Sequence, residues 1–168
     1  MAEGEFALVS EHMETAREKP GQPVTRGTMA HDHETYLMLV ESAVQRRDGE
    51  AILKYAPLLE ELAERDNHRL YLGIAHRALG VAHRLAGEYS EAEKRLDLAL
   101  ELFDQLGTTW QRGRTLVEMA ELEVSRSDQT LAQQYLSKAL EAFEVMKAAP
   151  EANKAKSAMT ILTETKSG

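Results

Sequence analysis

The sequence predicts an all-α protein built from tandem helix hairpins. Three observations support this: a composition rich in helix formers, a hydrophobic pattern that recurs along the chain at a fixed spacing, and glycines or prolines at the borders of the helical stretches. Ala, Leu, Glu, Lys, Arg and Gln dominate from Glu34 onward, and these residues have high helix propensities. No run alternates Val, Ile, Thr and aromatic residues, as a β-sheet core would require.

The repeat is the most informative feature. Residues 92–103 read AEKRLDLALELF and residues 132–143 read AQQYLSKALEAF, so that Ala, Leu, Ala, Leu and Phe recur at a spacing of 40. Upstream, Ala51 matches Ala92 at a spacing of 41. Repeats of about 20–50 residues indicate solenoids, in which each unit packs on its neighbours.

Each unit is expected to contain two helices. In the middle unit, apolar residues line one helical face over 75–86 and another over 92–106. Gly87 and Gly107 end these helices, because glycine adopts the left-handed conformation most easily. Thr108 or Thr109 is expected to cap the next helix, and Asp128 the one after it.

These signals define the expected organisation of the chain. Residues 1–30 are interpreted as a flexible arm, because the Pro-Gly-Gln-Pro run at 20–23 breaks any helix. The repeat domain covers 31–165, with units at about 31–67, 68–107 and 108–148. A single capping helix follows at 150–165, with Pro150 in its first turn.

The first unit is the least regular. Its opening helix is expected at about 34–46, but Pro57 falls inside its second helix. Proline there removes a backbone hydrogen bond and costs ~3 kcal/mol in a regular helix. We expect a kink near 53–57 or a helix that starts late; the alternative is that this unit is not a true repeat.

The middle unit resembles the tetratricopeptide repeat. The resemblance rests on Leu79-Gly80, on Gly87-Glu88-Tyr89, and on the small and apolar residues Ala92, Leu96 and Ala99. Gly80 is expected to let its helix approach Ala92 and Ala99 closely. The 40-residue period is similar to a long-helix variant of that family. The resemblance implies a right-handed α-solenoid of antiparallel hairpins.

Composition excludes several classes of function. The chain has 168 residues and a net charge of −8, which opposes binding to nucleic acid or to an anionic membrane. It has no cysteine, so disulfides and thiolate metal sites are excluded. No apolar run reaches the ~18 residues of a membrane span, and the N-terminus does not read as a secretory signal. We therefore expect a cytoplasmic protein.

Signatures of catalysis and metal binding are missing. There is no Gly-rich phosphate loop, no His-Glu-x-x-His and no Gly-x-Ser-x-Gly. His76 and His83 are about 10 Å apart by helical rise, too far to share an ion. His31 and His33 lack a third ligand. We expect no enzyme, metal or cofactor.

The resemblance implies that the first helices of the hairpins line a concave groove that receives a peptide. Helical spacing predicts which side chains face it. The expected partner-binding residues are Tyr36, Val40, Arg77, Val81, Arg84, Arg114, Val117 and Glu121, with His33 and Ile74 beside them. Because arginine forks suit carboxylates, an acidic peptide is the expected ligand. The alternative is that these arginines pair with Glu residues of adjacent helices.

The sequence therefore predicts a protein-interaction module or adaptor. An alternative, suggested by the long-helix resemblance, is a regulatory protein of bacterial signal transduction that acts in trans on a kinase, cyclase or transcription factor. A third reading is self-assembly into a homo-oligomer through the terminal helix, by Ala155, Met159 and Leu162. Trp110, Tyr89 and Tyr135 are expected to pack between helices.

Overall fold

The computed structural model describes residues 26–165, which contain seven helices and no strand. The helices are α2 (Arg26–Gln45), α3 (Gly49–Arg65), α4 (Arg69–Leu85), α5 (Tyr89–Gln105), α6 (Thr109–Ser125), α7 (Gln129–Val145) and α8 (Ala149–Thr165). The expected N-terminal arm lies outside the described residues up to residue 25, and residues 26–30 belong to α2.

The turns between the helices are built alike. From α3 to α8 every helix has the same length, and the helices begin at evenly spaced positions along the chain. One residue in every turn has a positive φ, between 52° and 79°: Arg47, Asn67, Gly87, Gly107, Ser127 and Lys147. The next amide bonds to the carbonyl five residues back, as His68 does to Ala63 at 2.7 Å, which completes a Schellman motif. The left-handed conformation is thus confirmed at Gly87 and Gly107.

Side-chain caps are present at two helix starts. The carboxylate of Asp128 accepts from the amide of Leu131 at 2.9 Å, which confirms the predicted cap of α7. Asp48 caps α3 in the same way. Thr108 stands at the N-cap position of α6, but its hydroxyl donates back to the Phe103 carbonyl. The prediction of a threonine side-chain cap there is therefore wrong.

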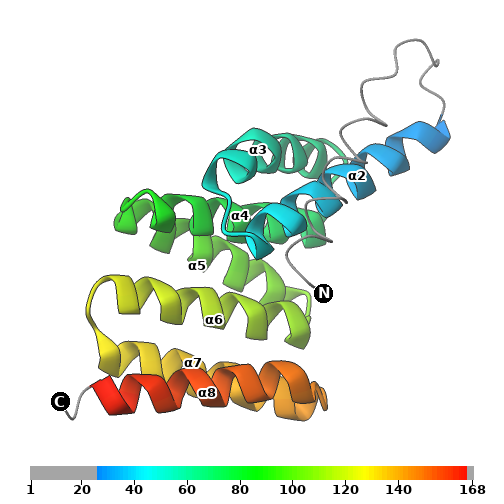
Figure 1. The fold of residues 1–168 in the computed structure, drawn as a ribbon. Coiled ribbons are helices and arrows are strands. Elements are labelled where there is room, and N and C mark those ends of the chain that lie inside the picture. The colour runs from blue at the N-terminus through cyan, green and yellow to red at the C-terminus, as the bar shows by residue number, and fades with distance from the viewer. Residues whose placement is uncertain (1–25, 166–168) are drawn as a thin grey trace.

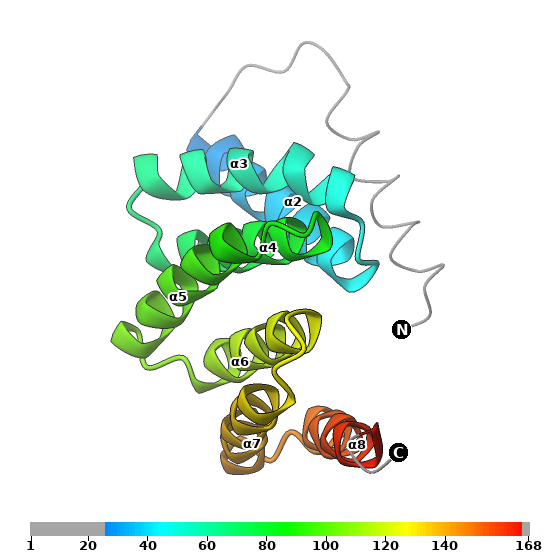
Figure 2. The same cartoon turned by 90° about the vertical axis from the view of Figure 1, so that its left-hand side faces the viewer.

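The hairpins stack into an all-α solenoid. Each helix packs against the next one along the chain, and the first helices of successive hairpins also touch, α2 with α4 and α4 with α6. Figure 1 shows the hairpins one below another, with α8 at the end of the stack. In Figure 2, α3 lies across the view whereas α7 and α8 are seen nearly end-on. The helix axes therefore rotate along the stack.

Glycines let the two helices of a hairpin approach closely. A Cβ added at Gly73 would lie 2.7 Å from the ring of Phe103, and one at Gly113 would lie 2.8 Å from Phe143. Since no Cβ tolerates such distances, each phenylalanine occupies the volume that the facing glycine leaves. At Gly80 the neighbours are the Leu96 side chain and, as predicted, the Ala92 backbone.

The first hairpin fills the same volume in the opposite way. At a spacing of 40 before Gly73 and Phe103 stand His33 and Ala63, and both are buried. The large side chain therefore comes from the first helix and the small one from the second. This exchange removes the glycine and the phenylalanine that make the later units recognisable in sequence.

The first unit is a repeat, but its register differs from the predicted one. Gly49 begins α3 and Tyr89 begins α5, which is a spacing of 40. Ile52 takes the place of Ala92, and both are fully buried. The predicted match of Ala51 with Ala92 at a spacing of 41 is therefore wrong by one position.

Pro57 does not shorten its helix. The helix α3 runs from Gly49 to Arg65 with Pro57 inside it, so the predicted late start is wrong. Pro57 is exposed, whereas its neighbours Tyr55 and Ala56 are buried. The carbonyl that loses its amide partner therefore lies on the solvent side, where water can satisfy it.

The terminal helix α8 takes the place of a first helix, because Ala149 at its start corresponds to Thr109 at the start of α6. Leu162 packs with Ala120 of α6 and Leu136 of α7, and Met159 packs against the same cluster. Ala155 is also buried. Ala155 and Leu162 therefore hold α8 on the stack and are not exposed to a second copy, whereas self-assembly through the terminal helix stays a prediction.

Candidate functional site

A groove lies on the face formed by α2, α4, α6 and α8. Its larger part has a volume of about 600 Å³ and is lined by Leu37, Glu41, Gln45, Ile74, Trp110, Gln111, Arg114, Glu151 and Lys154. A second part of about 340 Å³ extends between α6, α7 and α8 and shares Gln45, Arg114, Glu151 and Lys154 with the first. We call the two parts together the first-helix groove.

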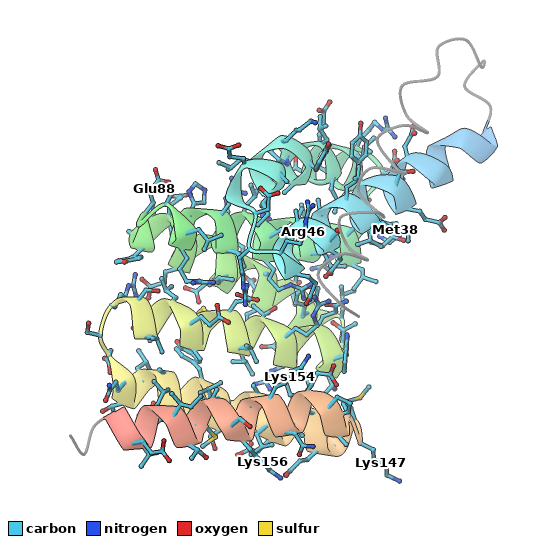
Figure 3. The ribbon with its side chains drawn as sticks, viewed as in Figure 1. Met38, Arg46, Glu88, Lys147, Lys154 and Lys156 are labelled. Carbon is cyan, nitrogen blue, oxygen red and sulfur yellow. The ribbon has the colours of Figure 1, made fainter. Side chains whose placement is uncertain are left out.

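Helical spacing brings these side chains to one face. Leu37, Glu41 and Gln45 recur at every fourth position and follow one stripe of α2. Figure 3 shows Lys154 rising from α8 on the side that faces α6. Lys154 follows Arg114 at a spacing of 40, so that α8 contributes to the groove as a fourth first helix.

A first ion-pair cluster crosses the groove around Glu41. The Arg114 guanidinium donates to both Glu41 oxygens, at 3.1 and 2.5 Å, and Arg77 donates to Oε1 at 2.6 Å. Arg77 also donates to Gln111 at 2.6 Å. We call Glu41, Arg77 and Arg114 the Glu41 cluster; it joins α2, α4 and α6.

A second cluster lies further along α4 and α6, toward their C-terminal ends. Arg47 donates to both oxygens of Glu118, at 2.9 and 2.7 Å, and to Glu121 at 2.6 Å. Arg84 donates to the other oxygen of Glu121 at 2.6 Å. These four residues, the Arg47 cluster, connect the turn after α2 directly to α6.

The pKa values show how strongly the protein shapes these charges. Burial lowers the pKa of Arg77 to about 10, so its guanidinium stays charged at neutral pH. Burial alone would raise the pKa of Glu41, but Arg77 and Arg114 outweigh it and hold that pKa below its ordinary value. Burial and the neighbouring Glu118 raise the pKa of Glu121.

The structure separates the predicted partner-binding residues into three groups. Arg114, Val117 and Glu121 line the groove, as does Ile74 beside them. Arg77 and Arg84 hold glutamates of neighbouring helices, and Arg114 does so as well while it lines the groove, as the alternative for the arginines predicts. Tyr36, Val40 and Val81 do not line it.

The misplacement in α2 follows from the register error. A shift of one position turns a side chain by about 100° around a helix. With the spacing of 40, Arg77 and Val81 correspond to Leu37 and Glu41, and those two line the groove. Val40 is fully buried instead.

Val81 is also fully buried, although its register was right. It packs in the cluster shared by the first two hairpins. At the same position of the helix, α2 and α6 carry Glu41 and Glu121. Helical spacing alone therefore does not decide whether the residue at this position faces the groove or the core.

Further groove residues escaped the sequence reasoning. Helical spacing in the sequence does not point to Gln45, Gln111 or Trp110 as groove residues, and α8 is expected only to cap the array. The spacing of 40 from Arg114 would have placed Lys154 in the groove. Trp110 is expected to pack between helices, and it does lie edge-on against Phe143, with ring centroids 5.8 Å apart.

His33, His76 and His83 have charged partners within the protein. The Nε2 of His33 lies 3.2 Å from Asp66, His76 contacts Glu60 and Arg95, and His83 contacts Glu88. Among the residues whose side chains are described, no group of three metal-ligating side chains is placed to hold an ion.

The family model of the tetratricopeptide repeat matches residues 71–144, which covers most of the second and third hairpins. Residues 71–144 form tetratricopeptide repeats. Proteins of this family generally mediate protein–protein interaction and are typically non-catalytic scaffolds.

The crystal structure of BtubC (BKLC) from P. vanneervenii is similar in fold, with a TM-score of 0.57 and 16% sequence identity. The alignment covers 99% of this chain and 76% of that chain. No curated protein matches the sequence. In the described part of the chain, no helix has the length and apolarity needed to cross a bilayer.

Proposed function

We propose that this chain is an interaction module that holds a peptide segment of a partner protein in the first-helix groove. The observation that carries the proposal is the groove itself, about 600 Å³ in its larger part, formed where four helices of the repeat array meet. Pockets of this size accept several side chains of a ligand. The regulatory alternative rests on the sequence resemblance alone.

The chain offers its own reporter for this binding. Trp110 lines the groove and is the only tryptophan in the sequence. A peptide that enters the groove displaces water from the indole, so its fluorescence should shift or quench in a saturable way. Peptides for the titration are selected from a random display library on the immobilised chain.

Variants of the groove lining test where the peptide binds. Lys154 faces the groove, whereas Lys156 pairs with Glu144 at 2.9 Å and points to the other side of the helix (Figure 3). Replacing both Gln45 and Lys154 by Ala removes two polar contacts worth ~1 kcal/mol each, so the dissociation constant should rise at least about tenfold. Lys156→Ala is the matched control and should leave it unchanged.

Equal losses in both variants would place the peptide elsewhere. Selected peptides that bind without changing the Trp110 emission would also contradict the proposed groove.

A further inference from the structure

The arginines of the first-helix groove already bind a carboxylate of the same chain. Glu41 accepts hydrogen bonds on both oxygens from Arg114 and a third from Arg77. A two-point contact between an arginine fork and a carboxylate is the arrangement that an acidic ligand would make. Here the carboxylate comes from α2, whereas the arginines come from α4 and α6.

This occupation is costly to reverse. The side chain of Arg77 is 2% exposed, so removing its carboxylate would leave a buried charge without its main partner. An incoming carboxylate would also have to enter beside Glu41, and repulsion by Glu41 would offset part of the attraction of the two arginines. Glu41 therefore weakens the preference of the arginines for an acidic partner.

The polar groups that remain available in the groove carry no net charge. Gln45, Glu151 and Lys154 line both of its parts, and their side chains form no hydrogen bond or ion pair with any described residue. Glu151 and Lys154 cancel each other in charge. The amide of Gln45 can both donate and accept, which suits the backbone of an extended peptide.

The apolar part of the lining is formed by Leu37, Ile74 and Trp110. The edge-on contact with Phe143 holds the Trp110 ring in place. A rigid aromatic wall beside aliphatic side chains is a suitable seat for one apolar side chain of a ligand.

We propose that Glu41 serves as a built-in carboxylate for the groove arginines, and that the partner segment is therefore a peptide with an apolar anchor residue and no acidic cluster. The inference rests on the proposed function, since it names the chemistry of the partner held in the same groove.

The wild-type chain provides the first test. Peptides selected from the random library should be enriched in Leu, Ile, Met or aromatic residues and not in Asp or Glu. A fluorescein-labelled hexaglutamate peptide should show no saturable binding to the wild type up to about 1 mM, the range of negligible affinity. Enrichment of acidic residues, or tight binding of hexaglutamate, would overturn the proposal.

The second test removes the internal carboxylate. Glu41→Gln keeps the shape of the side chain but frees Arg114, so hexaglutamate should bind at least about tenfold more tightly than to the wild type. Glu34→Gln makes the same change on the same helix, at an exposed residue without an ion pair among the described residues. It should have no effect.

Circular dichroism establishes whether each variant is folded. If Glu41→Gln does not fold, the composition of the peptides selected on the wild type still tests the proposal. If Glu41→Gln binds hexaglutamate no better than Glu34→Gln, the inference fails. The proposed function fails separately, if no selected peptide changes the emission of Trp110.

Discussion

Four of the six turns place a residue with a side chain in the left-handed conformation: Arg47, Asn67, Ser127 and Lys147. For an L-residue other than Gly or Asn this conformation costs roughly 1–2 kcal/mol. The Schellman hydrogen bonds form at these turns as they do at Gly87 and Gly107, so the packing of the helices imposes the conformation. The strain is tolerated because each turn satisfies two carbonyls at a helix end.

Lys147 is the position where this strain is most easily removed. It is exposed and extends away from the stack (Figure 3). Lys147→Gly should raise the free energy of unfolding by about 0.5 kcal/mol, since relief of strain exceeds the added entropy of the unfolded chain. Urea denaturation measures the change.

The reverse change gives the control. A Cβ at Gly87 would meet nothing within 4 Å, so only its φ of 79° opposes Gly87→Ala. That variant should lower the free energy of unfolding by about 1 kcal/mol. Stabilisation of both variants would show that the left-handed conformation is not the source of the difference.

At the scale of the helix pair, the two helices of each hairpin pack closely because a small residue on one helix faces a large residue on the other. The terminal helix departs from this pattern. Asn153 and Thr160 of α8 follow Gly113 and Ala120, which face α7, at a spacing of 40. Polar and larger side chains at these positions oppose close packing of a further second helix, so α8 has the polar outer face of a solenoid cap.

The fit between α6 and α7 can be tested with a double-mutant cycle. Gly113→Ala forces a Cβ to within 2.8 Å of Phe143 and should lower the free energy of unfolding by ~1–3 kcal/mol. Phe143→Leu frees space, so the double variant should lose less than the sum of the two single losses.

Gly49→Ala is the matched control, because the nearest atom to its new Cβ is 3.8 Å away, an ordinary contact. Thermal and urea unfolding of the wild type, the two single variants, the double variant and the control give the free energies of unfolding. Additive losses for Gly113→Ala and Phe143→Leu would contradict the steric explanation.

At the scale of the whole molecule, ion pairs connect units that are not neighbours in the array. Arg47 and Glu118 are 71 residues apart, and Glu41 and Arg114 are 73 apart. In a solenoid each repeat usually contacts only the adjacent ones. The two clusters therefore fasten the first hairpin to the third across the groove, and they limit how far the array can straighten.

The Arg47 cluster can be weakened without disturbing the hydrophobic core. Arg47→Gln removes the contacts with Glu118 and Glu121 and leaves Glu118, which is 7% exposed, with Arg84 as its remaining cation. Amides at the end of α2 should then exchange with deuterium about tenfold faster, since local opening becomes ~1.4 kcal/mol easier.

Arg46→Gln is the matched control, because Asp48 in its own turn, at 3.3 Å, is the only ion-pair partner of Arg46 among the described residues. It should leave the exchange of α2 unchanged. If both variants accelerate exchange equally, the contact between the first and third hairpins does not hold α2 in place.

Much of the fold could be predicted from local sequence. The apolar stripe of a helix, the glycine after it and the aspartate before the next one act within about two turns of chain, so their positions followed from the sequence. The first unit was harder, because His33 and Ala63 fill the space that glycine and phenylalanine fill elsewhere. In this hairpin one residue from each helix fills the shared space, and neither residue by itself identifies the repeat in the sequence.

By itself the sequence determined that 40-residue units of paired helices stack in a row, because hydrophobic period and turn residues are local properties of the chain. Only the tertiary structure decided which charges face the groove and which are paired. The partners of Glu41 and Arg47 come from other hairpins, brought near by the rotation of the stack. Nothing in the local sequence specifies that rotation, since it arises from how successive helices pack.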